Sequence, residues 1–276
     1  MDRRLTPANA RVAHVSLRGQ VTADRFVEGD WALIAAPLAD LEASPGGARD
    51  RQLLAGARVL VLERRDGHAF VQAARDGYVG YVAEAALGPD TTPSHWVVVP
   101  ATHLYPAPTL KRRELARLSF GAALRVTGTE GKFAAVDGGY VPAVHLRPIA
   151  DRAGDLVTVA EGFLGTPYLW GGNSRDGIDC SGLVQISAWA CGLDCPGDSD
   201  LQMERFGRPL APEEPLRRGD LLFWRGHVAI AVDAERLIHA NGHAMAVSYE
   251  GRAEAVERIL AAGEGPVLAR KRIDLR

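Results

Sequence analysis

Residues 166–185 read TPYLWGGNSRDGIDCSGLVQ, and the rest of the chain is interpreted outward from this stretch. It contains a Thr-Pro-Tyr turn signal and two adjacent glycines, and Asp179-Cys180-Ser181-Gly182 stands immediately before an apolar run. Glycine-rich and Asp-Gly segments favour a loop, and an apolar run that follows such a loop favours the start of a helix. The pattern therefore predicts a loop that delivers Cys180 to the first turn of a helix.

Cys180 has the predicted position of a nucleophile. A cysteine attacks as thiolate, and only a few per cent of a free thiol is ionised at neutral pH. A helix N-terminus favours an anion by about 0.3 to 1 kcal/mol, which is less than the ~1.36 kcal/mol of one pKa unit. We therefore expect a cationic partner as well. The alternative is that Cys180 is a buried structural cysteine, and the two downstream histidines favour the nucleophile.

Two histidines follow, and each is flanked by the apolar residues of a strand-like run. His227 stands in Gly226-His227-Val228-Ala229-Ile230 and His239 in Leu237-Ile238-His239-Ala240-Asn241. Cysteine, then histidine, then a polar third residue is the chain order of papain-like chemistry. His227 is predicted to be the base that pairs with the thiolate, and His239 to orient its ring. Asn241 is the competing orienter, because a neutral amide can fill that position.

Four blocks carry a resemblance to the NlpC family of bacterial cell-wall cysteine peptidases. They are TPYLWGG at 166–172, DCSG at 179–182, RRGDLLFWRGHVAIAV at 217–232 and LIHANG at 237–242. DCSG alone is a weak signal, but the four blocks in this order are highly specific. The resemblance covers residues 155–276 and implies a papain-like α+β domain, a Cys180-His227-His239 triad and no cofactor.

The elements expected in this domain place helices first and an antiparallel sheet afterwards. We expect helices over 156–164, 180–191 and 253–262, and strands beginning at Leu221, Val228, Leu237, Ala244 and Val267.

Upstream, an internal repeat of about sixty residues resembles a pair of bacterial SH3 domains. Gly80-Tyr81-Val82 precedes Leu87 with the same spacing that separates Gly139-Tyr140-Val141 from Leu146. Short apolar runs at 31–34, 59–62 and 69–71, broken by Asp-Gly turns, favour small β-barrels. The predicted organisation is an N-terminal extension over 1–30 with a short helix near Pro7, barrels over 31–88 and 94–148, and the catalytic domain over 155–276.

Composition limits the classes of partner. The 276 residues are 47% hydrophobic and 24% charged with a net charge of −2, as in an ordinary globular chain, so neither nucleic acid nor an anionic membrane is an expected partner. No apolar leader or membrane-spanning run is seen, so a cytoplasmic location is expected, with export by a non-classical route left open. Three cysteines are too few for a disulfide framework, and Cys191 and Cys195 are predicted to be reduced structural thiols.

Two other site types are disfavoured. His239 and His243 are four residues apart, which on a helix suggests a metal pair, but Asn241-Gly242 between them is a turn signal. Gly171-Gly172 lacks the strand before it and the Gly-Lys-Ser/Thr after it that a phosphate loop requires. We therefore expect no metal, and interpret the glycines as backbone freedom beside the nucleophile.

The oxyanion formed during acyl transfer needs preorganised donors. The backbone N–H of Cys180 and the hydroxyl of Tyr168 are candidates, and Asp179 and Ser181 join the predicted oxyanion and substrate-binding set. Trp170 is also included. For Tyr168 and Trp170 the alternative is a core aromatic packed under the nucleophile helix.

The resemblance also implies a substrate. NlpC-type enzymes with two N-terminal SH3 domains cleave the bond from γ-D-glutamate to a diamino acid in murein tripeptides and tetrapeptides that carry a free L-alanine N-terminus, during cell-wall recycling. Their residues at the ammonium end correspond to Asp198 and Ser199, although Gly197 replaces the family's usual arginine. In the first barrel Asp50 and Tyr78 correspond loosely to residues that close the pocket.

Two other functions use the same residues. One is an amidase or acyltransferase with this triad, and the other is a non-catalytic module that binds wall peptides. Diaminopimelate and lysine both remain candidates for the third residue of the peptide, and the role of the second barrel and the oligomeric state are left open.

Overall fold

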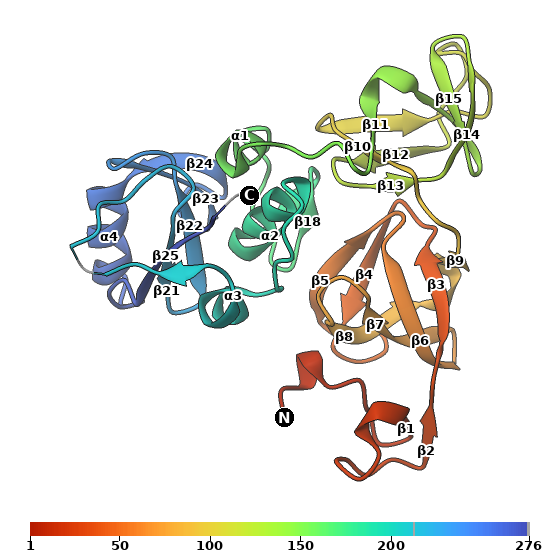
Figure 1. Ribbon diagram of the computed structural model, residues 1–276, viewed down its shortest axis with the longest axis horizontal. Helices are drawn as coiled ribbons and strands as arrows, with labels where there is room; N and C mark the ends of the chain where they lie inside the picture. Colours follow the sequence, from red (N-terminus) through yellow and green to blue (C-terminus); the bar gives the residue numbers. More distant parts are fainter. Residues whose placement is uncertain (212, 275–276) are drawn as a thin grey trace. The chain divides into compact units, whose positions relative to one another are not determined.

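The computed structural model describes residues 1–211 and 213–274, and its chain divides into two compact units, Met1–Asp151 and Arg152–Arg276 (Figure 1). Each unit is built from segments that are contiguous in the sequence. The boundary falls between the second predicted barrel and the predicted catalytic domain.

The C-terminal unit is an α+β domain with helices on both faces of an antiparallel sheet. Its sheet has the strand order β20-β25-β21-β22-β23-β24. Helices α1 and α2 pack on one face against β22 and β23, and α4 covers the other face (Figure 1). The elements are α1 (Leu156–Glu161), β18 (Asn173–Ser174), β19 (Gly177–Ile178), α2 (Cys180–Ala190), α3 (Ser199–Arg205), β20 (Arg208–Pro209), β21 (Leu221–Trp224), β22 (His227–Ala231), β23 (Arg236–Asn241), β24 (Ala246–Gly251), α4 (Arg252–Ala261) and β25 (Ala269–Arg272).

The predicted helices and strands of this unit are present, with shifted ends. Helix α1 stops at Glu161, three residues early, because the chain turns at Gly162 and reaches Gly165 with a positive φ of 76°. Strand β24 begins at Ala246 rather than Ala244, because the side chain of Asn241 accepts the Ala244 N–H at 2.7 Å and closes a turn. Helix α3 was not predicted, since its seven residues contain no long apolar period.

The first β-region, residues 30–89, forms one seven-stranded sheet of order β5-β4-β8-β7-β6-β3-β9. Its core contains Leu41, Val59, Val71 and Val82, all at 0% exposure. The strands are β3 (Asp30–Ile34), β4 (Leu38–Glu42), β5 (Arg49–Leu54), β6 (Arg58–Arg65), β7 (His68–Ala73), β8 (Val79–Ala83) and β9 (Leu87–Pro89).

The second β-region, residues 95–148, repeats these pairings. Strand β3 pairs with β6 and β9, and β10 pairs with β13 and β17 in the same way. In each region a Gly-Tyr-Val strand leads through a 3-10 turn, at Glu84–Ala86 or Ala143–His145, into the closing strand. The strands are β10 (His95–Val97), β11 (Ala101–Leu104), β12 (Ala116–Ser119), β13 (Ala123–Leu124), β14 (Val126–Glu130), β15 (Phe133–Val136), β16 (Gly139–Pro142) and β17 (Leu146–Pro148).

The predicted helix near Pro7 is wrong. The N-terminal segment instead has 3-10 turns at Arg3–Leu5 and Val15–Leu17, and a parallel pair of β1 (Val12–His14) with β2 (Arg25–Val27). The side chain of Asn9 accepts the N–H groups of Arg11 and Val12, both at 2.9 Å, which offers the backbone an alternative to a helix. Val12 is fully buried in a cluster that includes Leu60, so the segment packs on the first β-region.

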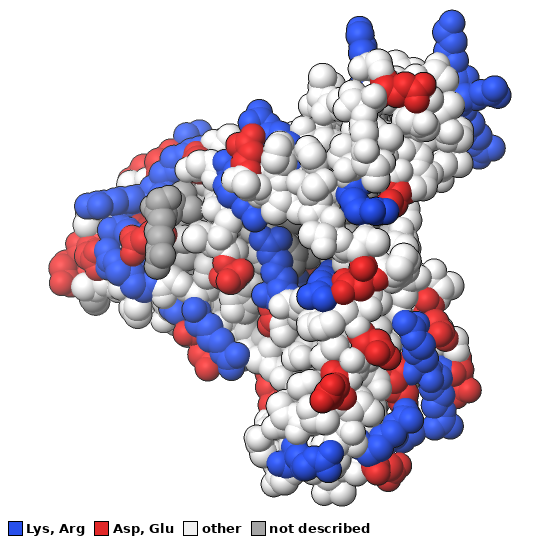
Figure 2. Space-filling model, turned by 45° about the vertical axis from the view of Figure 1, so that its right-hand side comes forward, with Lys and Arg blue, Asp and Glu red and all other residues white. Residues whose placement is uncertain are grey.

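The surface carries both signs of charge. Figure 2 shows lysine and arginine interspersed with aspartate and glutamate over the face in view. Many charged side chains of the protein are paired, as in Arg58 with Asp90 at 2.7 Å and Arg125 with Asp137 at 2.6 Å. Exposed pairs of this kind contribute little to stability, because solvent and salt screen them.

Candidate active site

Asp179 organises the loop that carries Cys180. Its Oδ1 accepts the Gly182 N–H at 2.6 Å and the Ser181 hydroxyl at 2.9 Å, and its Oδ2 accepts the Gly171 N–H at 2.9 Å. Asp179 is therefore the N-cap of α2 and also ties the preceding loop to the helix. Asp179 and Ser181 were both predicted to belong to the oxyanion and substrate-binding set. In the structure their side chains make these contacts within the loop and the first turn of α2.

The glycines beside the site are required by close packing. A Cβ at Gly172 would lie 2.5 Å from the Gly177 carbonyl oxygen, and a Cβ at Gly182 would lie 2.5 Å from the Gly172 carbonyl oxygen. Only glycine allows the loop and the first turn of α2 to approach this closely. The glycine-rich stretch thus sets the position of the nucleophile.

Cys180 is the first residue of α2 and is 5% exposed. Burial raises the pKa of its thiol to about 12, and the negative charge of Asp179 acts in the same direction. Backbone N–H groups of Val228, Ser181 and Cys180 itself oppose this rise, because they stabilise the thiolate. The contact with Val228 places the sulfur beside the strand residue that follows His227.

His227 and His239 form a directly bonded pair. Nε2 of His227 lies 2.8 Å from Nδ1 of His239, and the ring centroids are 5.1 Å apart. Burial lowers the pKa of His227 to about 3, His239 and Arg258 lower it further, and Glu250 raises it. Low solvation therefore disfavours both an isolated thiolate and an isolated imidazolium in the resting site.

His239, and not Asn241, contacts His227. Asn241 is buried, donates to Ser248 Oγ at 3.0 Å and accepts the Ala244 N–H at 2.7 Å. Its amide builds the turn between β23 and β24. This geometry favours His239 as the orienting residue.

Two residues missed by the sequence analysis continue the chain of contacts. Nε2 of His239 lies 2.9 Å from Oε2 of Glu250 on β24. Arg258 of α4 donates to both carboxylate oxygens of Glu250, at 2.7 and 2.8 Å. We call His227, His239, Glu250 and Arg258 the histidine chain. Glu250 could have been found only by pairing β23 with β24 in register, because the two residues are eleven positions apart.

The two aromatic residues of the loop differ. Burial raises the pKa of Tyr168, and the charges of Cys180 and Asp179 add to the effect, so its hydroxyl lies in the electrostatic neighbourhood of the thiol. Trp170 is 70% exposed, and the alternative that it is a core aromatic is wrong. Tyr168 is partly buried, so it is neither a core aromatic nor an exposed side chain like Trp170.

Asp198 and Ser199 stand at the start of α3. Asp198 has a φ of 58°, a left-handed conformation that is uncommon for a residue other than glycine, and Ser199 is 8% exposed. The fully buried side chain of Gln202 donates to the carbonyl oxygens of Ser181 and Pro196, at 2.9 and 3.0 Å. Gln202 therefore holds the segment carrying Asp198 against the first turn of α2.

The candidates in the N-terminal unit already have partners. Asp50 accepts two hydrogen bonds from the guanidinium of Arg3, at 2.7 and 3.2 Å. Tyr78 is 2% exposed in the core of the first β-region, and the Arg51 guanidinium carbon lies 5.1 Å from its ring centroid. Asp50 thus presents its carboxylate to a cation, whereas Tyr78 packs inside its own unit.

No group of three or more histidine, cysteine, aspartate or glutamate side chains with metal-site geometry occurs among residues 1–211 and 213–274. His239 is buried, whereas His243 is exposed in the turn that precedes β24. Cys191 is partly buried, Cys195 is buried, and neither is in a disulfide. In the same described part of the chain, no helix is both long and apolar enough to cross a membrane.

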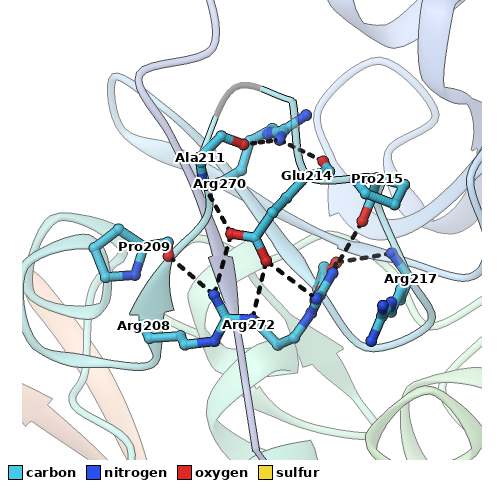
Figure 3. A network of polar contacts seen from close by, with 9 residues as sticks. Arg208, Pro209, Ala211, Glu214, Pro215, Arg217, Arg270 and Arg272 are labelled. Carbon is cyan, nitrogen blue, oxygen red and sulfur yellow. Dashed lines mark hydrogen bonds and ion pairs between the residues drawn. The ribbon is translucent and has the colours of Figure 1, made fainter.

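A second group of charged side chains lies at the β20 edge of the same sheet (Figure 3). Arg272 of β25 donates to both carboxylate oxygens of Asp220, each at 2.8 Å, and to the Pro215 carbonyl oxygen at 2.9 Å. Glu214 accepts from Arg208 at 3.1 and 3.2 Å, and Arg270 donates to the carbonyl oxygens of Ala211 and Glu214. We call Arg208, Glu214, Asp220, Arg270 and Arg272 the arginine cluster.

Two family models match the chain. Residues 165–260 match the NlpC/P60 family, and residues 41–87 match the bacterial dipeptidyl-peptidase Sh3 domain. The first match spans the loop, Cys180, both histidines and Glu250. The second lies within the first β-region.

Similar proteins are peptidases by name. The chain is 30% identical over 181 residues to gamma-D-glutamyl-L-lysine dipeptidyl-peptidase of Bacillus subtilis, which covers 59% of this chain and 60% of that protein. It is 36% identical over 87 residues to dipeptidyl-peptidase 6 of Lysinibacillus sphaericus, covering 32% of each. The chain therefore spans less than two thirds of the length of these curated relatives.

A crystal structure of an NlpC/P60 family protein from Bacillus cereus has a similar fold. The TM-score is 0.74 at 21% sequence identity, with 90% of this chain and 100% of that chain covered. At this level of identity the likeness supports the fold alone.

Proposed function

Because residues 165–260 form an NlpC/P60 domain and residues 41–87 a bacterial dipeptidyl-peptidase SH3 domain, we propose that this chain is a cysteine peptidase with Cys180 as nucleophile. The observation that carries the proposal is the geometry of the site. Cys180 starts α2 beside the Val228 N–H, and the neighbouring His227 is bonded to His239 at 2.8 Å. These contacts support the proposed roles of nucleophile, base and orienter, as in acyl-transfer enzymes.

The first half of the reaction forms a thioester. Nε2 of His227 is engaged by His239, so Nδ1 is the ring atom left for the thiol proton. As that proton moves to Nδ1, the sulfur bonds to the substrate carbonyl carbon and an oxyanion forms. The Cys180 N–H and the Tyr168 hydroxyl are the proposed donors to the oxyanion. The imidazolium then gives the proton to the leaving amine as the C–N bond breaks.

The second half releases the acyl group. A water molecule gives a proton to His227 and bonds to the thioester carbon, and the C–S bond breaks as the sulfur regains the proton. The pKa shifts of both groups favour the neutral pair, so charge separation is confined to the moments when substrate is in place. The reaction needs no redox partner or cofactor.

The proposed substrate is a murein tripeptide or tetrapeptide with a free N-terminal L-alanine. The enzyme would cleave the bond from γ-D-glutamate to diaminopimelate or lysine and release L-Ala-D-Glu. The name of the Bacillus subtilis relative supports this bond class, and the name of the Lysinibacillus relative supports release of a dipeptide. Asp198 and Ser199 are the proposed groups for the ammonium end, since a cation in a partly closed site favours carboxylate and hydroxyl acceptors. We also place the reaction in cytoplasmic recycling, which cell fractionation and analysis of accumulated wall peptides would test.

We further propose that the second β-region is a second SH3-like module. The support is the repetition of the β3, β6 and β9 pairings by β10, β13 and β17. Closure of either region into a barrel stays a prediction.

The central test is mass spectrometry of four peptides after incubation with the purified chain. They are L-Ala-γ-D-Glu followed by meso-diaminopimelate or L-lysine, each with a free or an acetylated N-terminus. Release of L-Ala-D-Glu from free-amine peptides only, and its loss in Cys180→Ala, is the expected result. Equal cleavage of blocked peptides would remove the requirement for a free amine. No cleavage of any peptide would contradict the peptidase proposal and favour another acyl donor or a binding module.

Asp50 is tested by substitution. If it recognises the substrate ammonium, Asp50→Ala should raise KM for free-amine peptides by about tenfold or more, because a charge-assisted hydrogen bond contributes about 1.5–3 kcal/mol. Asp90→Ala is the matched control, since it also removes a carboxylate paired with an arginine in the same unit. An equal effect of Asp50→Ala on free and blocked peptides would refute this role.

A further inference from the structure

The histidine chain does not end at its second imidazole. His239 is 1% exposed, and its Nε2 contacts Oε2 of Glu250 at 2.9 Å. Glu250 is in turn held by two hydrogen bonds from Arg258, which comes from α4, the helix that packs on the same face of the β23-β24 hairpin. A buried polar chain of this kind has a direction, set by the member that can only accept or only donate.

We propose that Glu250, anchored by Arg258, is a positioning residue that fixes the tautomer of both histidines and so leaves Nδ1 of His227 as the acceptor for the Cys180 proton. This inference rests on the proposed peptidase function and extends it by two residues. Neither residue touches the sulfur, and both act through His239.

The direction follows from the chemistry of the carboxylate. An ionised carboxylate only accepts, so His239 must donate from Nε2. A neutral imidazole has a single N–H, so Nδ1 of His239 must accept, and Nε2 of His227 must donate to it across 2.8 Å. The one N–H of neutral His227 is then on Nε2, and its Nδ1 is a lone pair.

Without the carboxylate, the hydrogen bond between the two imidazoles can reverse its direction. His239 could then carry its proton on Nδ1 and donate to Nε2 of His227, which would place the only N–H of His227 on Nδ1. That ring could not take the thiol proton. Glu250 therefore selects the productive one of two arrangements that have the same heavy-atom positions.

Arg258 keeps the anchor ionised and aligned. Its two hydrogen bonds, followed by the bond from His239, hold the pKa of Glu250 well below its usual range. The carboxylate consequently stays charged through the neutral range. The paired donors also fix the plane of the carboxylate, which directs Oε2 toward His239.

Glu250 and Arg258 have opposite electrostatic effects on the pKa of His227. His239 comes from β23, Glu250 from β24 and Arg258 from α4. Glu250 raises the pKa of His227, whereas Arg258 lowers it. Glu250→Gln should therefore lower the pKa of His227, and Arg258→Gln should raise it, although both substitutions remove the same ion pair.

The test is ¹⁵N NMR of imidazole-labelled full-length protein at neutral pH, which reports the protonated nitrogen directly. In the wild type, His239 should carry its proton on Nε2. In Glu250→Gln this signature should give way to a mixture of tautomers, and kcat should fall about 10–10²-fold with little change in KM, as for other supporting residues behind a catalytic group. Arg236→Gln is the matched control, because it removes an arginine–carboxylate pair from β23 without touching either histidine.

A wild-type His239 protonated on Nδ1 would overturn the inference, and so would Glu250→Gln with unchanged tautomers. The inference would also be overturned if Glu250→Gln and Arg258→Gln shifted the pKa of His227 in the same direction. A purely structural role for the two residues does not predict shifts of opposite sign. If Glu250→Gln does not fold, the tautomer of His239 in the wild type and the pKa of His227 in Arg258→Gln still test the inference. Absence of peptide cleavage by a wild type with the expected tautomer would count against the proposed function only.

Discussion

The histidine chain and the arginine cluster are both networks of polar side chains on the same six-stranded sheet, yet they are suited to different tasks. The histidine chain passes through two imidazoles, whose ring nitrogens donate or accept according to the tautomer. The arginine cluster contains only guanidinium groups, which donate, and carboxylate groups, which accept (Figure 3). A buried polar network is therefore no sign of catalysis unless its members can exchange donor and acceptor roles.

Their connections to the fold differ as well. The Asp220 carboxylate is 1% exposed, accepts the Arg217 N–H at 2.7 Å and binds Arg272, so it ties the β21 side of the sheet to β25. Arg272 is thus paired with the carboxylates of both Asp220 and Glu214. In the histidine chain, by contrast, Nδ1 of His227 is the atom that we propose for the thiol proton. The comparison predicts that substitutions in one network change rate and those in the other change stability.

The largest expected effect is on turnover. His227→Ala should lower kcat by about 10³-fold or more, because the thiol loses its base and the leaving amine loses its acid. The midpoint of thermal unfolding should change by only a few degrees, since His227 is partly exposed at the start of β22. Peptide cleavage and differential scanning calorimetry measure the two quantities. Retained turnover would remove His227 from the mechanism.

The largest expected effect on stability comes from the other network. Asp220→Asn should lower the free energy of unfolding by about 3–5 kcal/mol, because it leaves the Arg272 charge in a site that is 9% exposed. The lower end is favoured, since Glu214 remains 3.5 Å from Arg272. Urea denaturation gives the stability, and kcat per folded molecule should stay at the wild-type value. A loss of kcat without loss of stability would break the comparison.

The pH dependence of the thiol gives a smaller but distinctive effect. Since burial raises the pKa of Cys180 to about 12, the thiolate fraction of the resting enzyme should be below that of a free cysteine at every pH from 6 to 10. Alkylation of Cys180 by iodoacetamide, followed by mass spectrometry, should accelerate as the pH rises and still be accelerating above pH 10. A plateau reached below pH 7 would show instead that the resting pair is a thiolate and an imidazolium.

The smallest expected effect is at the rim of the arginine cluster. Arg208 bonds Glu214 at 3.1 Å, but both side chains are substantially exposed, so solvent screens the pair. Arg208→Gln should leave both the unfolding midpoint and kcat essentially unchanged. A large loss of stability would show that the edge of the cluster and its buried centre form one cooperative network.

Much of the site was predictable because its signals are local. The start of α2 at Cys180 follows from a glycine-rich loop and an apolar run within a few positions of one another. The strands that carry His227 and His239, and the repeated Gly-Tyr-Val segments, follow from alternation and turn residues of the same short range. The sequence by itself thus determined most of the elements that surround the site, and it pointed to the thiol and its two candidate histidines.

Only the tertiary structure decided which side chains meet. Pairing of β23 with β24 opposes His239 to Ser248 and Leu237 to Glu250, which puts His239 and Glu250 diagonally on one face. Packing of α4 on that face then adds Arg258. Strand register and helix packing arise from contacts between residues distant in the sequence, so a local pattern cannot specify them. For the same reason, the capping role of Asp179, the exposure of Trp170 and the partner of Asp50 emerged only in the folded chain.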